Sequence, residues 1–319
     1  MPFFLKRIKG LSDDREVLQS MKIKTDSMPF VTVIVPVYNA EDFIGKCLSA
    51  LSEQDYPKDR HRIIVVDNGS KDNTRSIIRL FPEITLLVEH TIQSSYAARN
   101  RGIRDAKSDI YAFTDSDCIP EKDWISAASR FFMNNDADLV GGHVNFIYTD
   151  RFTAAEIYDS FVHMQNHSCI VERGVAKTAN LFVKSVVFDT IGLFDSSLKS
   201  GGDVLFTKKA TDNNFKLLYC KDSIVSHPTR RFVELIAKTL RTGYGKGLIN
   251  RDIKMSKTVR QVIKQIVSPP NPFYWKKRVI SEKIPASRFK IFRISLVMYI
   301  TMVLSRFSEL VGRFSVRNQ

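Results

Sequence analysis

Short apolar runs rich in β-branched residues alternate with helical segments in the first third of the chain. The runs have the length and composition of buried strands and lie at residues 31–37, 63–66, 84–88 and 110–114. Helical segments are expected between them, at residues 41–54 and 94–107. Strands that alternate with helices form right-handed βαβ units. The pattern therefore predicts an α/β, Rossmann-like fold with a mostly parallel central sheet.

The pattern continues less regularly up to residue 230. Residues 139–144 are expected to form a strand and residues 153–167 a helix. Residues 167–177 are polar and lack a clean period, which predicts a loop that could act as a lid. Asn180 is expected on a strand, and Asp203 opens an amphipathic segment in which it could be a helix N-cap.

Polar side chains follow the predicted strands at their carboxyl ends. Tyr38 and Asn39 follow the first strand, Asp67 the second, and Asp115-Ser116-Asp117 the fourth. Ligands of open α/β sheets bind at this edge. Two carboxylates so close repel each other unless a cation such as Mg²⁺ or Mn²⁺ neutralises them while bridging phosphate oxygens. The sequence thus indicates a metal-diphosphate site, although each residue could instead serve an ordinary polar turn.

The same side chains suit a nucleotide. An aromatic ring such as that of Tyr38 can stack on a base, and the Asp67 carboxylate can accept from a base N–H or a ribose hydroxyl. Arg99 and Arg101 on the intervening helix could meet the phosphates, or they could form a solvated helix face.

Composition narrows the class of protein. A chain of 319 residues with 44% hydrophobic content is globular rather than disordered. The four cysteines include no close pair, and no apolar segment follows the basic residues of the N-terminus. We therefore expect reduced thiols and a cytosolic setting.

The net charge of +14 is concentrated at one end of the chain. Residues 231–319 contain 19 lysine or arginine residues and 4 acidic ones, whereas residues 1–230 contain 29 and 30. A nucleic-acid-binding protein would instead carry a basic stripe on its folded domain. We therefore expect no nucleic-acid partner, and we place a functional boundary near Arg230.

The basic end has three notable stretches. Residues 241–247 are glycine-rich and could contact a diphosphate or an anionic acceptor, or form an exposed helix end with a loop. Residues 271–278 interleave aromatic and cationic side chains, which suits the headgroup layer of a bilayer. Residues 291–310 are apolar, but their uncharged core at 294–304 falls short of the ~20 residues that span a bilayer. This predicts an interfacial helix on an anionic membrane surface, or alternatively a helix packed on the domain or on a second copy.

Taken in order, these motifs resemble those of the family-two glycosyltransferases, which have the GT-A fold of nucleotide-diphospho-sugar transferases. The resemblance spans about residues 31–228 and rests on residues 35–39, 65–70, 97–102, 115–117, 179–180, 191–195 and 201–206. Each motif is short, but the ordered set is specific.

The resemblance implies a role for each matching residue. The nucleotide-sugar donor would be held by Pro36, Tyr38, Asn39, Asp67, Arg99, Asp115 and Ser116. Asp115 and Asp117 would bind Mn²⁺ or Mg²⁺, and His227 would complete that metal site or else be a structural histidine. Asp203 would be the base that takes the proton from the acceptor hydroxyl. Gly202 departs from the family pattern, because a glutamate usually stands there and contacts the acceptor.

The sequence therefore predicts an inverting, metal-dependent glycosyltransferase. Residues 1–30 would be a lead-in, residues 31–117 and 118–230 the donor and acceptor halves of the catalytic domain, and residues 231–319 a helical membrane-associating region. The expected partners are a UDP-sugar, a saccharide or lipid-linked acceptor, and an anionic membrane surface on the cytoplasmic side, in surface polysaccharide or glycolipid synthesis. A sugar-phosphate nucleotidyltransferase and a non-catalytic nucleotide-sugar-binding protein are the alternatives. The first would require a glycine-rich loop after the first strand, which residues 36–39 do not provide.

Overall fold

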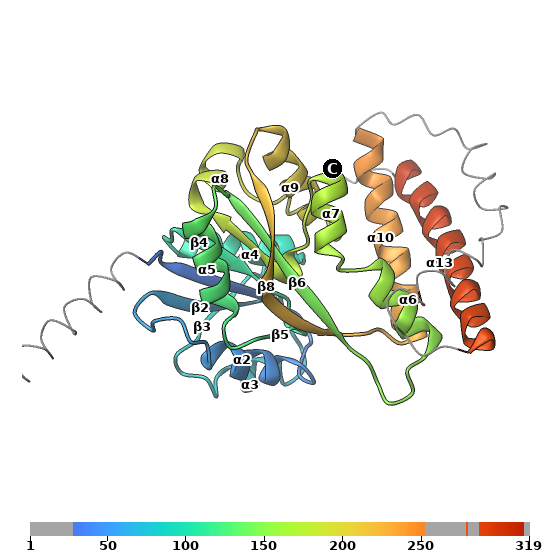
Figure 1. Ribbon diagram of the computed structural model, residues 1–319, viewed down its shortest axis with the longest axis horizontal. Coiled ribbons are helices and arrows are strands. Elements are labelled where there is room, and N and C mark those ends of the chain that lie inside the picture. The colour runs from blue at the N-terminus through green and yellow to red at the C-terminus, as the bar shows by residue number, and fades with distance from the viewer. Residues whose placement is uncertain (1–27, 253–278, 280–286, 316–319) are drawn as a thin grey trace, which may run out of the picture.

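A curled sheet covered by helices on both faces, with a pair of long helices beside it, makes up the described part of the chain (Figure 1). This computed structural model describes residues 28–252, 279 and 287–315. Most of the expected lead-in and the aromatic-cationic stretch at 271–278 lie outside the described residues.

The sheet has eight strands in the order β3-β2-β1-β4-β7-β6-β8-β5. β1 to β4 are parallel to one another, as are β6 and β8, whereas β7 runs antiparallel to β4 and β6, and the short β5 runs antiparallel to β8. The strands are β1 (Val31–Val37), β2 (His61–Asp67), β3 (Thr85–Val88), β4 (Ile110–Phe113), β5 (Ile119–Pro120), β6 (Leu139–Ile147), β7 (Leu181–Lys184) and β8 (Leu217–Pro228). The predicted α/β fold with a mostly parallel sheet is confirmed.

Strand β1 shows why both faces of the sheet must be covered. All seven of its residues are buried. Val33 and Val35 belong to the apolar layer on one face and Ile34 to the layer on the other, as the alternation of side chains along a strand requires. The first layer contains α2 (Ile44–Ser52), α3 (Thr74–Ile78) and α5 (Trp124–Asn134). The second contains α4 (Ser95–Asp105), α7 (Asn166–Arg173), α8 (Ser185–Ile191) and α9 (Gly202–Asp212).

The prediction of a loop at residues 167–177 was wrong, because most of this segment is helix α7. Asn166, at its start, donates from its side chain to the carbonyl oxygens of Gly142 and Asn180. Ile170 packs over Gly141, and Gly174 ends the helix in the left-handed conformation. These contacts with the sheet stabilise a helix that the local sequence does not favour.

Helices α10 (Phe232–Asp252) and α13 (Arg288–Phe314) lie side by side at the far end from β3, with α6 (Ala154–Val162) next to them (Figure 1). Gly243 and Gly247 of α10 face α13. A Cβ at Gly243 would lie 2.6 Å from the carbonyl oxygen of Ser305, and one at Gly247 would overlap the carbonyl oxygen of Glu309. Two small residues four apart let helix backbones approach closely, as in membrane helices. Residues 241–247 lie within α10, so their interpretation as an exposed helix end with a loop was wrong. Their contact with a diphosphate or an anionic acceptor stays a prediction.

Both faces of α13 are mixed in polarity. Ser295, Thr301, Ser308 and Glu309 are buried together with Ile294 and Val297. Several large apolar side chains point outward, with Phe292 63% and Phe307 61% exposed. By length and composition α13 could cross a membrane, and one third of its apolar window is buried in the protein.

Candidate active site

The carboxyl ends of β2, β1 and β4 lie next to one another, because β1 is between the other two in the sheet. This arrangement brings the residues that follow the three strands to one edge. Tyr38 is 46% exposed there, which leaves its ring free to stack on a ligand. Pro36 is buried within β1, one residue from the strand end.

Asp67 and Asn39 tie the first two loops of this edge together. The buried Asp67 carboxylate accepts from Arg75 Nε at 2.7 Å and from the backbone N–H groups of Gly69 and Ser70. Asn39 adopts a positive φ of 47° and donates its backbone N–H to the Ser70 hydroxyl. The Asp67 carboxylate, which is predicted to bind the nucleobase, is thus oriented by Arg75, a residue that the sequence did not single out.

Arg99 meets the aspartate cluster at the end of β4. Its side chain is buried, and one terminal nitrogen lies 2.5 Å from Asp115 Oδ1. The Arg99 Nε is buried without a hydrogen-bond partner among the described residues. Asp115, Ser116 and Asp117 are partly exposed, so their side chains are accessible from solvent. A buried guanidinium with an unused donor beside accessible carboxylates suits a metal-bound diphosphate.

His227 at the end of β8 lies against Asp117. Its Nε2 is 3.4 Å from Asp117 Oδ2, and its Nδ1 is 2.5 Å from the carbonyl oxygen of Pro228. A carbonyl oxygen can only accept, so Nδ1 carries the proton. Nε2 faces Asp117 Oδ2 and also lies 3.2 Å from a terminal nitrogen of Arg230, which can donate to it. Metal-binding histidines have this arrangement, in which the second nitrogen donates to a backbone carbonyl.

Asp117, His227 and Cys118 form a group close enough to hold a metal ion. Burial raises the pKa of the Cys118 thiol well above its usual value, with further contributions from Asp117 and Asp115. A thiol that stays protonated is a poor ligand. The remaining imidazole and carboxylates fit Mn²⁺, whose protein ligands are mainly oxygen and imidazole donors.

Asp203 lies in the first turn of α9, and Gly201 in the left-handed conformation is the N-cap. The interpretation of Asp203 as N-cap was therefore wrong. Asp203 Oδ1 accepts from the Tyr96 hydroxyl at 3.3 Å and from the Val204 backbone N–H at 2.9 Å. No donor among the described residues contacts Oδ2, which remains available to accept a proton.

Tyr96 explains why residue 202 is a glycine. A Cβ at Gly202 would lie 2.8 Å from the buried Tyr96 ring. The ring thus fills the space that the first atoms of a larger side chain would need. The Arg99 guanidinium lies over the same ring, 5.6 Å from its centre, in a cation–π contact. The chain of contacts from Asp203 through Tyr96 and Arg99 to Asp115 links the predicted base to the predicted diphosphate site.

A buried ionic network contacts His227 through Arg230. The sequence did not predict this network. An Arg230 terminal nitrogen lies 3.2 Å from His227 Nε2, and its other one is 3.4 Å from the fully buried Asp159. Burial would raise the pKa of Asp159, but hydrogen bonding to His163 and the nearby Lys238 charge lower it. Burial, followed by repulsion from Arg230, lowers the pKa of Lys238 to about 7. No local sequence pattern connects these residues, which come from separate helices and a loop.

Comparison with known proteins identifies the family. The model of "Glycosyl transferase family 2" matches residues 32–188. Glycosyltransferase AglE of Haloferax volcanii is 46% identical over 226 residues, which cover 70% of this chain and 74% of that protein. A dolichyl N-acetyl-alpha-D-glucosaminyl phosphate 3-beta-D-2,3-diacetamido-2,3-dideoxy-beta-D-glucuronosyltransferase of Methanococcus voltae is 26% identical and covers 70% of this chain and 75% of that protein.

Solved structures show the same fold. Mannosyltransferase PcManGT from Pyrobaculum calidifontis, in complex with GDP-Man and Mn²⁺, superposes with a TM-score of 0.58 at 18% identity, over 91% of this chain and 88% of that chain. Residues 1–349 of TarS from Staphylococcus aureus, in complex with UDP-GlcNAc, give a TM-score of 0.52 at 19% identity, over 89% and 91%. With sequence identity this high to AglE along most of both chains, and with the donor-site motifs in family order, this chain belongs to glycosyltransferase family 2.

Proposed function

We propose that this glycosyltransferase is inverting and metal-dependent, and that it moves a sugar from a UDP-sugar to a hydroxyl acceptor. The observation that carries the proposal is the position of Asp203, whose carboxylate is connected through Tyr96 and Arg99 to Asp115. A base and a diphosphate site in one connected assembly are what a single displacement requires.

The donor would lie along the edge formed by Tyr38, Asp67 and Asp115. Tyr38 offers an exposed ring for the base, and the Arg99 guanidinium, which contacts Asp115, would add positive charge beside the diphosphate. The structures of PcManGT with GDP-Man and of TarS with UDP-GlcNAc support a nucleotide-sugar donor of this kind.

The reaction would be one displacement. The acceptor oxygen attacks the anomeric carbon while the bond from that carbon to the diphosphate oxygen breaks, and the hydroxyl proton passes to Asp203 Oδ2. Tyr96 holds the carboxylate through Oδ1 and keeps Oδ2 turned toward the proton. Attack opposite to the leaving group inverts the configuration at the anomeric carbon.

Asp115, Asp117 and His227 would hold Mn²⁺ or Mg²⁺. When bound, the cation neutralises the charge that develops on the leaving diphosphate. His227→Ala should weaken the dependence of activity on Mn²⁺, because it removes the imidazole that faces Asp117. Unchanged metal affinity in that variant would remove His227 from the site.

We further propose that the acceptor is lipid-linked and that residues 231–319 hold the enzyme on the cytoplasmic face of the membrane, with residues 31–230 as the catalytic domain. The exposed phenylalanines of α13 support this, because they face outward where lipid would be. The relative from Methanococcus voltae is named for a dolichyl-linked acceptor, which is consistent with this proposal.

The test has two stages. In the first, thermal unfolding is followed with UDP-, GDP- and other nucleotide sugars, with and without Mn²⁺; a specific donor at about 100 times its dissociation constant should stabilise the fold by about 2.7 kcal/mol. In the second, Asp203→Asn should bind that donor normally but transfer sugar about 10²–10⁴-fold more slowly.

The matched control is Asp212→Asn, at the exposed end of the same helix, where the carboxylate pairs only with Lys208 among the described residues. It should leave transfer unchanged. Full activity of Asp203→Asn would refute the assignment of the base, and a donor that binds without any transfer by the native enzyme would favour a non-catalytic binding protein.

A further inference from the structure

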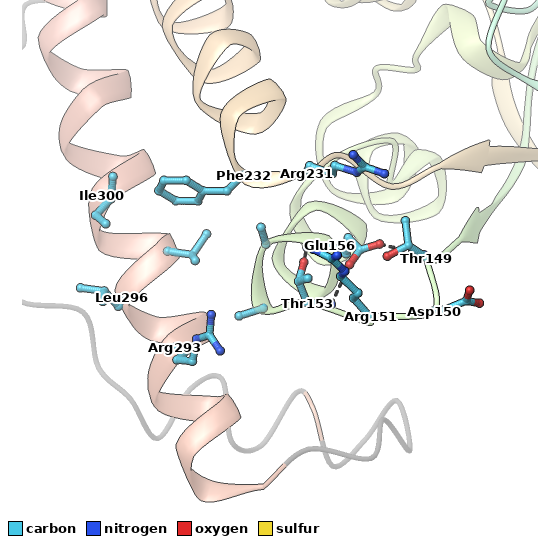
Figure 2. A pocket seen from close by; sticks show the side chains of 13 residues that line it. Thr149, Asp150, Arg151, Thr153, Glu156, Arg231, Phe232, Arg293, Leu296 and Ile300 are labelled. Atoms are coloured by element: carbon cyan, nitrogen blue, oxygen red, sulfur yellow. Dashed lines mark hydrogen bonds between the residues drawn. The ribbon is translucent and has the colours of Figure 1, made fainter. Parts of the chain in front are cut away.

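A cavity of about 660 Å³ lies between the loop from β6 to α6, the start of α10 and one side of α13 (Figure 2). None of the residues assigned above to the donor, the metal or the base lines it. It combines a basic surface with an apolar one.

Three arginines supply the first surface. Arg151 comes from the loop, Arg231 precedes α10, and Arg293 lies on α13 (Figure 2). All three are exposed, and none forms an ion pair with a carboxylate within the described ranges. The cavity is therefore rich in unpaired positive charge.

Two acidic residues also line the cavity, and they reduce this charge only in part. The Glu156 carboxylate is fully engaged, because it accepts from the backbone N–H groups of Thr149 and Thr153 and from the Thr229 hydroxyl. Asp150 is exposed to solvent at the edge of the loop (Figure 2). The three guanidinium groups therefore leave the cavity with a net positive charge, which would attract an anion such as a phosphate.

An apolar wall supplies the second surface. Leu296, Val297 and Ile300 of α13 face the cavity together with Phe232 (Figure 2). Leu296 is 48% exposed, and the outward-facing Phe292 lies one turn before it on the same helix. The wall therefore continues into the apolar outer surface of α13. A phosphate attached to a hydrocarbon chain matches both surfaces, whereas a free anion uses only the first.

The cavity is close to the proposed metal site along the chain. His227, which faces Asp117, lies four positions before Arg231, which lines the cavity. A chain segment of this length spans at most about 14 Å. A lipid phosphate in the cavity would thus lie near the proposed metal site, where a saccharide attached to it would meet the donor.

We propose that the cavity binds the phosphate of the lipid carrier on which the acceptor saccharide is built, with the hydrocarbon chain against α13. This inference rests on the proposed function, since it names the lipid part of the acceptor. The arginines bind the phosphate, and the apolar side of α13 binds the hydrocarbon chain.

The test uses the full chain in a neutral detergent and farnesyl phosphate as the probe, with binding measured by calorimetry. Farnesyl phosphate should bind saturably and more tightly than inorganic phosphate or farnesol. Arg151→Gln/Arg293→Gln should weaken it by about 10–100-fold, the size of a lost charged hydrogen bond. The control Arg79→Gln changes an exposed arginine at the end of α3 and should retain native affinity.

Three results would overturn the inference. Inorganic phosphate that binds as tightly as farnesyl phosphate would indicate a site for free anions. Phosphatidylglycerol vesicles that bind with the same dependence on the arginines, and that farnesyl phosphate does not displace, would indicate general contact with the membrane. Unchanged affinity in the double variant would exclude these arginines.

The donor measurement keeps this inference separate from the proposed function. The same preparations are tested for stabilisation by a nucleotide sugar with Mn²⁺, which the double variant should retain. If the native chain binds a donor but not farnesyl phosphate, only the lipid site is refuted. If it binds no donor, the proposed function fails.

Discussion

Tyr96 and Gly202 illustrate how single residues shape the proposed catalytic centre. The Tyr96 hydroxyl contacts the Asp203 carboxylate, while its ring occupies the space beside Gly202. Burial, with a further contribution from Asp203, raises the pKa of Tyr96 far above its usual value, so the phenol stays protonated and remains a donor. A side chain larger than glycine at residue 202 would therefore displace the Tyr96 ring.

Gly202→Ala should destabilise the fold by about 1–3 kcal/mol, the usual cost of overpacking, and should also slow transfer by moving the Tyr96 ring. The ring cannot easily move away, because it is 5% exposed and packs against Phe194. Denaturant unfolding and a transfer assay would measure the two effects. Gly45→Ala is the control: a Cβ there meets only Ile77 at 3.6 Å, so the change in the first turn of α2 should be neutral or stabilising. Equal responses at both positions would contradict the role of Tyr96.

At the scale of elements, the junction of α10 and α13 depends on small side chains rather than on apolar volume. The Tyr244 backbone of α10 contacts Gly312 of α13, and Gly247 of α10 contacts the Glu309 backbone of α13. The Ser308 hydroxyl donates to the Leu240 carbonyl oxygen at 2.6 Å across the same junction. Close backbone approach and hydrogen bonds between helices are how helices associate where water does not supply the driving force.

Gly247→Ala should separate the two helices and cost about 1–3 kcal/mol, because the added methyl group would overlap the α13 backbone. Thermal unfolding of the full chain in detergent would measure the loss. Ala237→Leu adds more atoms to the same helix at an exposed position and should have little effect. A neutral Gly247→Ala would mean that the helices are not in close contact.

The start of α6 gives a prediction that depends on pH. Burial would raise the pKa of Glu156, but the Thr153 and Thr149 N–H donors lower it from 4.5 to about 2. A carboxylate with a lowered pKa stabilises the folded state above the unfolded pKa and loses this effect as the pH falls. Glu156→Gln should therefore cost about 2 kcal/mol at neutral pH, and the difference from the native chain should shrink between pH 4.5 and 2.

Thermal unfolding of both chains over this pH range would test the prediction. Glu234→Gln, in the first turn of α10, removes an exposed carboxylate that accepts only from the Arg231 N–H among the described residues, and should cost less than about 1 kcal/mol. A difference between Glu156→Gln and the native chain that did not change with pH would contradict the ionised capping role.

At the scale of the whole molecule, charge and apolar surface are separated along the chain. The excess positive charge lies in residues 231–319, and exposed phenylalanines gather on α13 in the same region. The sheet domain up to residue 230 is nearly neutral and buries its apolar residues in two layers. Such a molecule would present one end to an anionic membrane and leave the donor edge in solution.

Phe292→Ser/Phe307→Ser should reduce sedimentation of the full chain with phosphatidylglycerol-containing vesicles. Each buried phenylalanine contributes about 1.5–3 kcal/mol, so two losses should lower the partition constant by at least about 100-fold. Raised salt should weaken binding further, because it screens the basic residues. Leu80→Ser removes an apolar side chain that is 76% exposed outside α13 and should not matter. Unchanged sedimentation of the double variant would refute α13 as the membrane contact.

The sequence by itself determined β1 to β4 and the residues that follow β1, β2 and β4 at one edge of the sheet. This was possible because strand periodicity and turn chemistry are local, and because parallel βαβ units bring Tyr38, Asp67 and Asp115 to the same edge. Only the tertiary structure decided the rest. α7 forms because the sheet holds Asn166 and Ile170, Gly247 is explained by a helix some 60 residues further along the chain, and Gly202 is explained by Tyr96. These features depend on contacts between residues far apart in the sequence, which no local pattern encodes.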